Sequence, residues 1–569
     1  MVAPLDSLAE VRSLYVLHKA RLIYPLFQAR SLEQEALTTA AIVRRKINDE
    51  SSPIYQLPSE SLAAVASYLK IRDLFTAVHV SHRWRATLRS FLSLWSNIQD
   101  GNRKEMLAML EWSESAPLRV SIKLGYPPEE VVDSLCSNSA RIVSLRSDNR
   151  AVLKKLLSHP MSSLKALSIR MDGPADALYR AQDIADEPAK VVPSLRALSV
   201  GGNVGGLCFC LPHLTHFKFH EWHSQETGGK MLLAILGVFR RCPMLEVVDV
   251  GWGEELYNSG DVVFTEADII SLPHLRYLAQ EQYIAVDQPW LPDLLHLPQP
   301  CSIYLKKPPV IHGSDSAGWL ALPFLHPKSP YLSDIRRVKL RTGYNHSENS
   351  MATFMEIINA QGTLLSFQKG VTPGGHIRNP WVVMDNEINS TSLCTLSSVN
   401  TGSPMVLCLY NYQLLSGQGG SPAYVARGLQ GLGNVTTLIL SYSAVEPCLI
   451  ALEPDNEEKL QWCSTVHSLV IHSRFQTDLT GSDILQSLLI VAKKRKMAKA
   501  PFRSVTLAIP STDLVVSPGE LAALNEYIER FEFLVGDDAL DWDVNKYFIP
   551  DYDPLWRRRD GFAFDLDEF

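Results

Sequence analysis

A short motif recurs along most of this chain and constrains its fold more than any other feature. The motif is L-x-x-L-x-L with apolar substitutions. Its last two apolar positions are two residues apart, so they fall on one face of a β-strand. The first apolar positions of its eight copies are Leu164, Leu195, Leu214, Leu245, Leu275, Ile335, Val435 and Val466. Four of their separations are 30 or 31 residues and one is 60. A fixed period of this size predicts a solenoid of stacked units.

Two further features keep the same period. Apolar stretches with helical character fall between the copies, for example at residues 231–239 and 484–491. A proline precedes four of the copies at a matching offset, namely Pro193, Pro212, Pro243 and Pro273. Strand followed by helix at this period resembles a divergent leucine-rich repeat, and the resemblance implies an extended concave surface that could hold another protein. The alternative is a non-repetitive α/β region whose strands share a pattern by chance.

The repeat pattern is irregular. The asparagine that usually follows the strand in leucine-rich repeats occurs once, as Asn203. The spacing fails between residues 340 and 434, and glycine, serine and proline cluster at residues 413–422. We therefore expect irregular repeats with a long insertion or surface loop in this part of the chain.

Residues 57–95 follow a different pattern, which predicts three short amphipathic helices. Pro58 suits the first position of the first helix, and Asp73 is a suitable N-cap for the second. The apolar positions spaced by three or four residues are Leu62, Val65 and Leu69 in the first helix, Leu74 and Val78 in the second, and Val80, Trp84 and Leu88 in the third. Helices this short cannot bury all of their own apolar residues, so we expect the segment to dock on a partner.

This segment resembles the F-box, the adaptor-binding module of ubiquitin-ligase substrate receptors. The residues that carry the resemblance are Leu57, Pro58, Glu60, Leu62, Val65, Leu69, Asp73, Leu74, Val80, Arg83, Trp84, Leu94 and Trp95. The resemblance implies a small helical bundle that binds a Skp-family adaptor, which in turn binds a cullin. It implies adaptor contacts from Leu57, Pro58, Leu62, Val65, Leu74, Val80, Trp84 and Trp95. The alternative is an ordinary helical subdomain whose leucines are plain core.

Two positions depart from the F-box pattern. Ser61 stands where the family usually has a bulky aliphatic residue, and Ala66 where it often has a large one. Loss of a fully buried apolar side chain costs roughly 1.5–3 kcal/mol. The departures leave the expected fold unchanged, but they put the strength of adaptor binding in doubt.

The two ends of the chain have patterns of their own. Residues 1–50 predict helices interrupted at Pro25, and Ser31 with Gln34 resembles a capping box. An apolar stripe follows at Leu32, Ala36, Ala40, Val43 and Ile47. We expect this helix to pack on its neighbour, with an oligomerising coiled coil as the alternative. Residues 537–569 carry ten acidic, four basic and eight aromatic residues. We expect this tail to cap the last repeat, or else to bind a partner and fold on contact.

Composition narrows the class of protein. The net charge of −7 argues against general nucleic-acid binding, which favours basic patches. The nine cysteines form no C-x-x-C pair and sit mostly in apolar runs, so we expect buried thiols in a reducing compartment. We see no secretory leader and no apolar run long enough to span a bilayer. We therefore expect a cytoplasmic or nuclear protein that binds neither nucleic acid nor membrane.

No catalytic, cofactor-binding or metal-binding motif stands out. The densest histidine cluster consists of His216, His220, Glu221 and His223. It follows a predicted strand, whereas the H-E-x-x-H zinc motif needs a helix, so we interpret it as a solvated strand end. A basic run at residues 493–496 follows an apolar helix. We interpret it as cations at the helix C-terminus, with a nuclear localisation signal as the alternative.

These patterns together predict an α/β protein with a small helical F-box followed by an irregular leucine-rich-repeat-like α/β solenoid. The expected segments are a helical lead-in (1–50), the F-box (51–98), the repeat region (99–536) and the tail (537–569). The predicted function is the non-catalytic substrate-recognition subunit of a Skp–cullin–F-box ubiquitin ligase, with an unknown protein substrate. One alternative is a cullin-independent F-box scaffold, and another is an enzyme in the repeat region.

Overall fold

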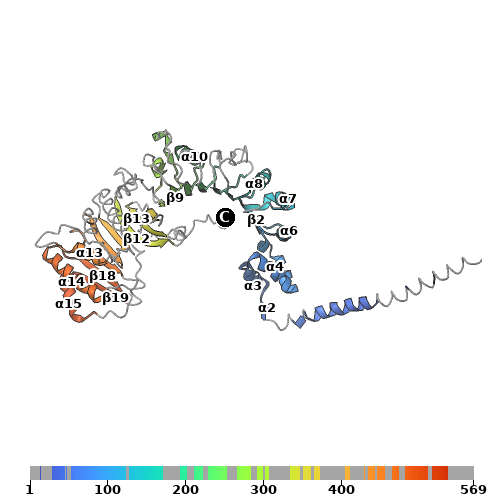
Figure 1. The fold of residues 1–569 in the computed structure, drawn as a ribbon, viewed down its shortest axis with the longest axis horizontal. Helices are drawn as coiled ribbons and strands as arrows, with labels where there is room; N and C mark the ends of the chain where they lie inside the picture. Colours follow the sequence, from blue (N-terminus) through green and yellow to red (C-terminus); the bar gives the residue numbers. More distant parts are fainter. Residues whose placement is uncertain are drawn as a thin grey trace, which may run out of the picture. The chain divides into compact units, whose positions relative to one another are not determined.

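The structure, a computed structural model, divides into two compact units, Met1–Arg119 and Val120–Phe569 (Figure 1). It describes residues 28–44, 46–47, 53–122, 127–170, 192–201, 211–221, 228–252, 265–282, 291–298, 301–306, 334–345, 350–360, 364–371, 404–410, 433–441, 445–454, 464–472, 481–509 and 516–535, with Ser13, Lys19 and Leu429 as single positions. The predictions for Asn203, His223, residues 413–422 and the tail at 537–569 therefore lie outside the described residues.

The first unit is helical, as the sequence predicts. Its elements are α2 (Pro53–Gln56), α3 (Ser59–Ser67), α4 (Ile71–Val80), α5 (His82–Ser90), the 3-10 helix η1 (Leu92–Trp95), β1 (Asn97–Gln99) and α6 (Arg103–Trp112). Residues 28–44 and 46–47 are helical as well. The unit continues beyond residue 98, where the expected F-box segment ends, because α6 packs on η1 and β1.

Three aromatic rings hold the first unit together. The Trp95 and Trp112 ring centroids lie 4.7 Å apart at 83°, an edge-to-face contact, and Phe75 lies 5.3 Å from Trp95 and 5.5 Å from Trp112. Trp95 is fully buried, and its indole N–H donates a 2.8 Å hydrogen bond to the Leu88 carbonyl. The Arg89 guanidinium lies over the Trp112 ring at 4.8 Å. A buried indole with its N–H satisfied combines a large apolar area with a fixed orientation.

Several local predictions for these helices are wrong by one or a few residues. Pro58 is the N-cap of α3 instead of its first helical residue. Asp73 lies within the first turn of α4, where the helix dipole favours an acidic side chain, instead of capping it. Val80 ends α4 instead of opening the next helix, because Ser81 caps α5 and accepts a hydrogen bond from the Trp84 amide. Ser31 is not a cap, because residues 28–30 are already helical.

The second unit alternates strands and helices, and the unit boundary falls within β2. Its earlier elements are β2 (Leu118–Ile122), α7 (Glu129–Ser137), η2 (Ser139–Arg141), β3 (Ile142–Ser147), α8 (Arg150–Leu157), β4 (Ala166–Arg170), β5 (Ala197–Gly201), β6 (His216–Glu221), α10 (Gly228–Arg241), β7 (Val247–Trp252), η5 (Glu266–Asp268), β8 (Ile270–Ser271), β9 (Tyr277–Gln282), η6 (Leu291–Leu294), β10 (Leu295–His296) and β11 (Ser302–Lys306).

The later elements continue the same alternation after a block of strands. They are β12 (Ile335–Asn345), β13 (Ser350–Asn359), β14 (Leu364–Val371), β15 (Met405–Tyr410), β16 (Val435–Ser441), α13 (Val445–Leu452), β17 (Ser468–His472), α14 (Gly481–Met497), β18 (Ser504–Ile509), α15 (Pro518–Tyr527) and β19 (Arg530–Val535). The two helices predicted at residues 231–239 and 484–491 are confirmed as parts of α10 and α14.

The strands of the second unit pair in chain order almost throughout. Parallel pairs join β3, β4, β5, β6, β7, β9 and β11 in that order. Next comes an antiparallel meander of β14, β13 and β12, in which β14 pairs with β11 and β12 pairs with β15. Parallel pairing resumes from β15 to β19. β8 and β10 pair separately. Part of the segment expected as an insertion is therefore strand that belongs to the sheet.

The motif copies share one backbone turn. In five of them the leading leucine N–H donates to the carbonyl three residues earlier: Leu164 to Met161, Leu195 to Val192, Leu214 to Leu211, Leu245 to Cys242 and Leu275 to Leu272, at 2.9–3.3 Å. The four periodic prolines each occupy the second position of this turn, where their fixed φ is favourable. The periodic prolines therefore mark structurally equivalent positions.

A ladder of hydrogen bonds joins each turn to the next. The amide after the leading leucine donates to the carbonyl of the equivalent residue one copy earlier: Arg196 to Lys165, Thr215 to Arg196, Glu246 to Thr215 and Arg276 to Glu246, each at 2.8 Å. All eight leading apolar residues are buried, as the motif predicts. The ladder sets the register between neighbouring strands, so the apolar positions of successive copies lie side by side.

Helices cover the last strands of the sheet. α14 packs on both α13 and α15, while α13 contacts β16 and α15 contacts β19 (Figure 1). The basic run at residues 493–496 lies at the C-terminal end of α14, as interpreted from the sequence. Within it Arg495 is fully buried, with its Nη2 donating to the Val466 carbonyl at 2.6 Å and its guanidinium 4.6 Å from the centre of the Phe502 ring. This arginine is part of the core.

The aromatic cluster predicts that Trp112 stabilises helices well outside its own. We expect Trp112→Ala to lower the free energy of unfolding of the first unit by about 2–3 kcal/mol, because a half-buried ring that contacts Trp95 and Phe75 is lost. Hydrogen exchange of the α4 and α5 amides in the full-length protein measures this change. Tyr68→Ala is the matched control, since Tyr68 is 89% exposed. Equal exchange in the two variants would contradict the structural role of Trp112.

Candidate functional site

Between residues 54 and 80 the first unit exposes several large apolar side chains. They are Ile54, Leu57, Val65, Tyr68, Leu69 and Val80, and we refer to them as the exposed apolar set. Val65 is 53% exposed and Val80 67% exposed. Single exposed apolar residues are common on protein surfaces, but here six occur within residues 54–80.

The local structure explains why these side chains are outside. α3 buries Leu62, Ala63 and Ala66, so the residues on its other side remain exposed. Val65 lies in α3, Tyr68 is the C-cap of this helix and Leu69 follows it, so the exposed side chains continue past the helix end. The segment before α3 is tied to α5 by a hydrogen bond from Arg83 Nη2 to the Leu57 carbonyl. These contacts keep the exposed apolar set on an ordered support.

The eight residues predicted as adaptor contacts do not share one surface. Leu62, Leu74 and Trp95 are buried in the interior of the unit. Leu57, Pro58, Val65 and Val80 are exposed, and Trp84 is half-buried. Adaptor binding by any of these residues stays a prediction, but buried side chains are not available at the surface without rearrangement. Sequence reasoning missed Ile54 and Tyr68, although Tyr68 follows Val65 by three residues, which is the spacing of one helix face.

The small residue at position 66 lies inside the unit. Ala66 is 1% exposed, so its departure from the F-box pattern affects the interior of α3 and not the exposed apolar set. Ser61 is half-buried. The doubt about adaptor binding that these two positions raise therefore rests mainly on Ser61.

Comparison with known proteins agrees with this geometry. Residues 54–99 match the F-box-like family, a range that runs from α2 to β1 and contains the whole exposed apolar set. The chain carries an F-box-like domain. Domains of this kind typically bind Skp-family adaptors, which suggests a role in SCF-type ubiquitin ligases or in protein interaction. A search of the curated proteins found no match to this chain.

A second group of polar residues lies on β6 and β7, on the sheet face opposite the motif residues. Lys218 and Asp249 are register partners, and Lys218 Nζ lies 2.9 Å from Asp249 Oδ2. His220 Nε2 lies 3.0 Å from Asp249 Oδ1. The adjacent Phe217, Phe219, Val248 and Val250 are buried on the motif face. The two basic side chains therefore hold one carboxylate on this face, where Val247, Tyr277 and Ala279 form a buried apolar cluster.

The electrostatics of this carboxylate follow from its partners. Burial by itself raises the pKa of Asp249, because it disfavours the charged form. The hydrogen bond and charge of His220, together with Lys218, outweigh burial and lower the pKa from 3.8 to about 2. Asp249 is therefore ionised at neutral pH and stabilises the fold through these partners.

The described residues show no metal centre or membrane span. No three of their His, Cys, Asp or Glu side chains are grouped to hold a metal ion. His216, His220 and Glu221 lie on strand β6, a geometry that does not fit the helical H-E-x-x-H motif. In the same part of the chain no helix combines the length and apolar character needed to cross a bilayer.

The pKa of Asp249 predicts a pH-dependent contribution to stability. At neutral pH we expect Asp249→Asn to lower the free energy of unfolding by about 2 kcal/mol. Because the folded-state pKa is depressed, this contribution is complete above the ordinary value of 3.8 and is lost as the pH falls toward about 2. Urea unfolding of wild type and variant between pH 7 and pH 2 measures the difference.

The matched control for this prediction is an exposed carboxylate. Asp133 pairs with Lys155 at 2.6 Å, but its side chain is 57% exposed, so Asp133→Asn should cost less than about 1 kcal/mol. A difference between Asp249→Asn and wild type that stays constant down to pH 2 would contradict the assignment.

Proposed function

We propose that this chain is the non-catalytic substrate receptor of a Skp–cullin–F-box ubiquitin ligase. The observation that carries the proposal is the exposed apolar set, which lies wholly within the residues that match the F-box-like family. In this account Leu57, Val65, Tyr68, Leu69 and Val80 enter the interface with the Skp-family adaptor. The buried Leu62, Leu74 and Trp95 support that surface from inside.

Burial of these side chains supplies a sufficient driving force for binding. Fully burying one Val, Leu or Ile side chain is worth about 1.5–3 kcal/mol relative to leaving it exposed. Each side chain of the exposed apolar set is only partly exposed, so only part of its surface can be newly buried on binding. Association also carries an entropy cost. Several partly exposed residues are therefore needed together, and the exposed apolar set provides them on α2, α3, the end of α4 and the segments that join these helices.

We propose that the second unit is a divergent leucine-rich-repeat-like solenoid that holds the substrate. The shared turn, the ladder of hydrogen bonds and the chain-order pairing of the strands support this interpretation. Lys218 and His220, which lie on β6 at intermediate exposure, are candidates for contact with substrate. Recognition would depend on a few such side chains.

The mechanism follows from proximity. A receptor that holds both adaptor and substrate raises the effective concentration of a substrate lysine near the ubiquitin-conjugating enzyme. It needs no catalytic residue and no cofactor of its own. We further propose a cytoplasmic or nuclear location, which is supported by buried, unbridged thiols at Cys136, Cys242, Cys301, Cys408 and Cys448.

Affinity capture with paired variants tests the role of the exposed apolar set. We expect the full-length protein to capture a purified Skp-family adaptor and a cullin. We expect the double variant Val65→Glu/Val80→Glu to bind the adaptor at least about tenfold more weakly. Each charge that is buried at an apolar contact costs more than about 1 kcal/mol. Ile490→Glu is the matched control, because Ile490 on α14 is 51% exposed and lies outside the F-box-like range.

The outcomes separate the candidate functions. Capture of adaptor and cullin by wild type and Ile490→Glu, but not by the double variant, supports the receptor. Capture of adaptor without cullin favours a cullin-independent scaffold. Failure of wild type to bind any adaptor contradicts both.

A further inference from the structure

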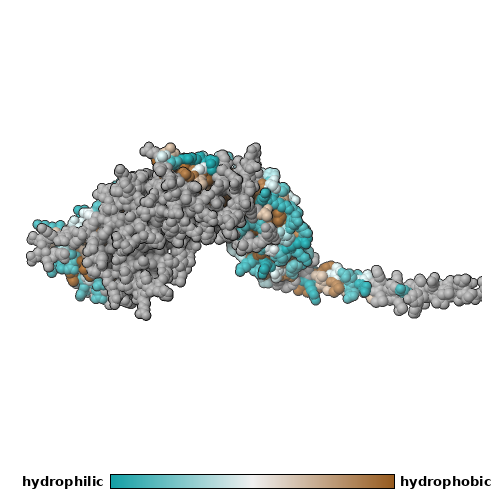
Figure 2. Space-filling view, turned by 45° about the horizontal axis from the view of Figure 1, so that its top comes forward, coloured by the Kyte–Doolittle hydropathy of each residue, from teal (hydrophilic) through white to brown (hydrophobic). Residues whose placement is uncertain are grey.

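The helix at residues 28–47 exposes an apolar stripe of its own. Every described position in it is exposed, so packing on a neighbouring helix of the chain finds no support among the described residues. Leu32 is 66% exposed, Val43 50% and Ile47 55%. Figure 2 shows hydrophobic residues at the surface along this helix. An apolar stripe exposed along one face of a helix marks a surface that another protein segment can cover.

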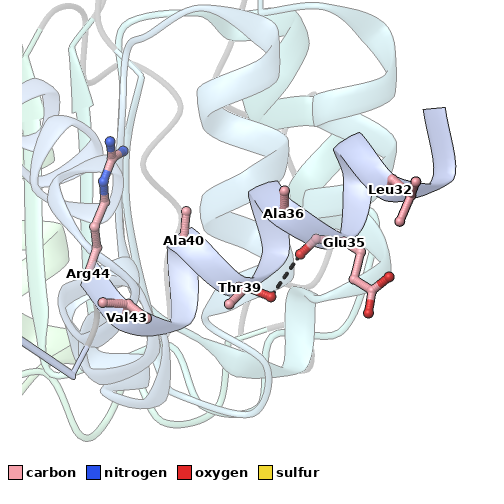
Figure 3. A pocket seen from close by; sticks show the side chains of 7 residues that line it. All are labelled: Leu32, Glu35, Ala36, Thr39, Ala40, Val43 and Arg44. Carbon is pink, nitrogen blue, oxygen red and sulfur yellow. Dashed lines mark hydrogen bonds between the residues drawn. The ribbon is translucent and has the colours of Figure 1, made fainter. Parts of the chain in front are cut away.

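The stripe has the shape of a helix-packing face. A shallow surface pocket is lined by Leu32, Glu35, Ala36, Thr39, Ala40, Val43 and Arg44, all from this one helix. Seen onto this face, Ala36, Ala40 and Arg44 project on one side, and Glu35 and Thr39 on the other (Figure 3). The Thr39 hydroxyl donates to the Glu35 carbonyl at 2.9 Å, so it does not oppose apolar packing. Alanines in the middle of the stripe allow a second helix to approach closely.

Charge is distributed unevenly along the same helix. Glu33 and Glu35 lie in its first half, which also carries Arg30, and Arg44, Arg45 and Lys46 lie in its second half. Glu33 and Arg44 are 11 residues apart, as are Glu35 and Lys46. Eleven residues make about three helical turns, so the two members of each pair lie on the same side, or flank, of the stripe. Each flank therefore has an acidic end and a basic end.

We propose that this helix binds the same helix of a second copy of the chain in antiparallel orientation. An axis between positions 39 and 40 places Leu32 opposite Ile47 of the other copy and Ala36 opposite Val43. The same axis places Glu33 near Arg44 and Glu35 near Lys46 of the other copy. A parallel pair would instead bring like charges to the same level. The pattern is thus self-complementary in one orientation only.

The length of the helix sets the strength of this contact. Twenty residues span about 30 Å, and a two-helix interface of that size is at the small end of specific protein interfaces. The dimer is therefore reversible and depends on concentration. Two receptor copies held together would engage a substrate or substrate assembly at two points, which increases avidity without any new substrate contact.

Sedimentation equilibrium of the full-length protein over a hundredfold range of concentration tests the proposal. Wild type is expected to pass from monomer to dimer, and Leu32→Glu/Val43→Glu is expected to remain monomeric throughout. Leu37→Glu is the matched control, because Leu37 is 60% exposed on the same helix but lies off the stripe. This variant should dimerise as wild type does. A wild type that stays monomeric overturns the proposal. The proposal is also overturned if Leu32→Glu/Val43→Glu still dimerises, or if Leu37→Glu abolishes the dimer as completely as Leu32→Glu/Val43→Glu does.

Charge variants test the orientation. Glu33→Lys/Glu35→Lys makes both ends of each flank basic and should weaken the antiparallel dimer by at least about tenfold at low salt. Adding Arg44→Glu and Lys46→Glu restores a self-complementary pattern and should return the affinity to that of wild type. In a parallel dimer the three proteins would associate equally, because like charges face each other in all of them, and that result would overturn the antiparallel arrangement.

Discussion

A short helical bundle can bury only some of its apolar side chains, and the first unit depends on how that limit is resolved. Its interior is filled by the Trp95, Trp112 and Phe75 rings, with the aliphatic residues of α3 and α4 packed nearby. Once these positions are filled, Val65 and Val80 have no place inside. The surface proposed to bind the adaptor is therefore a direct consequence of how little core such small helices can enclose.

In the second unit, backbone hydrogen bonds keep many short strands in register. The hydrogen bond inside each turn fixes the leading leucine, and the next amide joins the turn to its predecessor. Because both interactions are made by the backbone, the intervening segments vary in length without shifting the strands. The leading residues Leu195 and Leu214 are only 19 residues apart, yet β5 and β6 pair as regularly as strands separated by a full period.

The strand pattern was readable from the sequence where it depends on local spacing. All eight leading residues are buried, and the prolines occupy equivalent turn positions. Sequence reasoning failed for strands that the eight motif copies do not include. The β12–β14 meander has no counterpart in the motif, and β18 was missed although Phe502, Val505 and Leu507 follow the motif spacing. The strand at the end, β19, was missed as well, although Ile528, Phe531 and Phe533 follow the same spacing.

The candidate site was also predicted only in part. The family resemblance located the segment, but it does not say which side of a helix meets the core. Leu62 and Val65 are three residues apart, and the first is buried while the second is exposed. The buried side of α3 packs on α5 and η1, which come later in the sequence, so the pattern within α3 alone does not identify that side.

The most direct test of the central claim is a footprint of the adaptor on the full-length protein. Hydrogen exchange measured with and without a Skp-family adaptor reports which amides the complex protects. The account predicts protection concentrated between residues 54 and 80, on α2, α3 and α4, with exchange in the second unit unchanged. Protection that spares these helices while the adaptor is bound would show that the exposed apolar set is not the adaptor-binding surface.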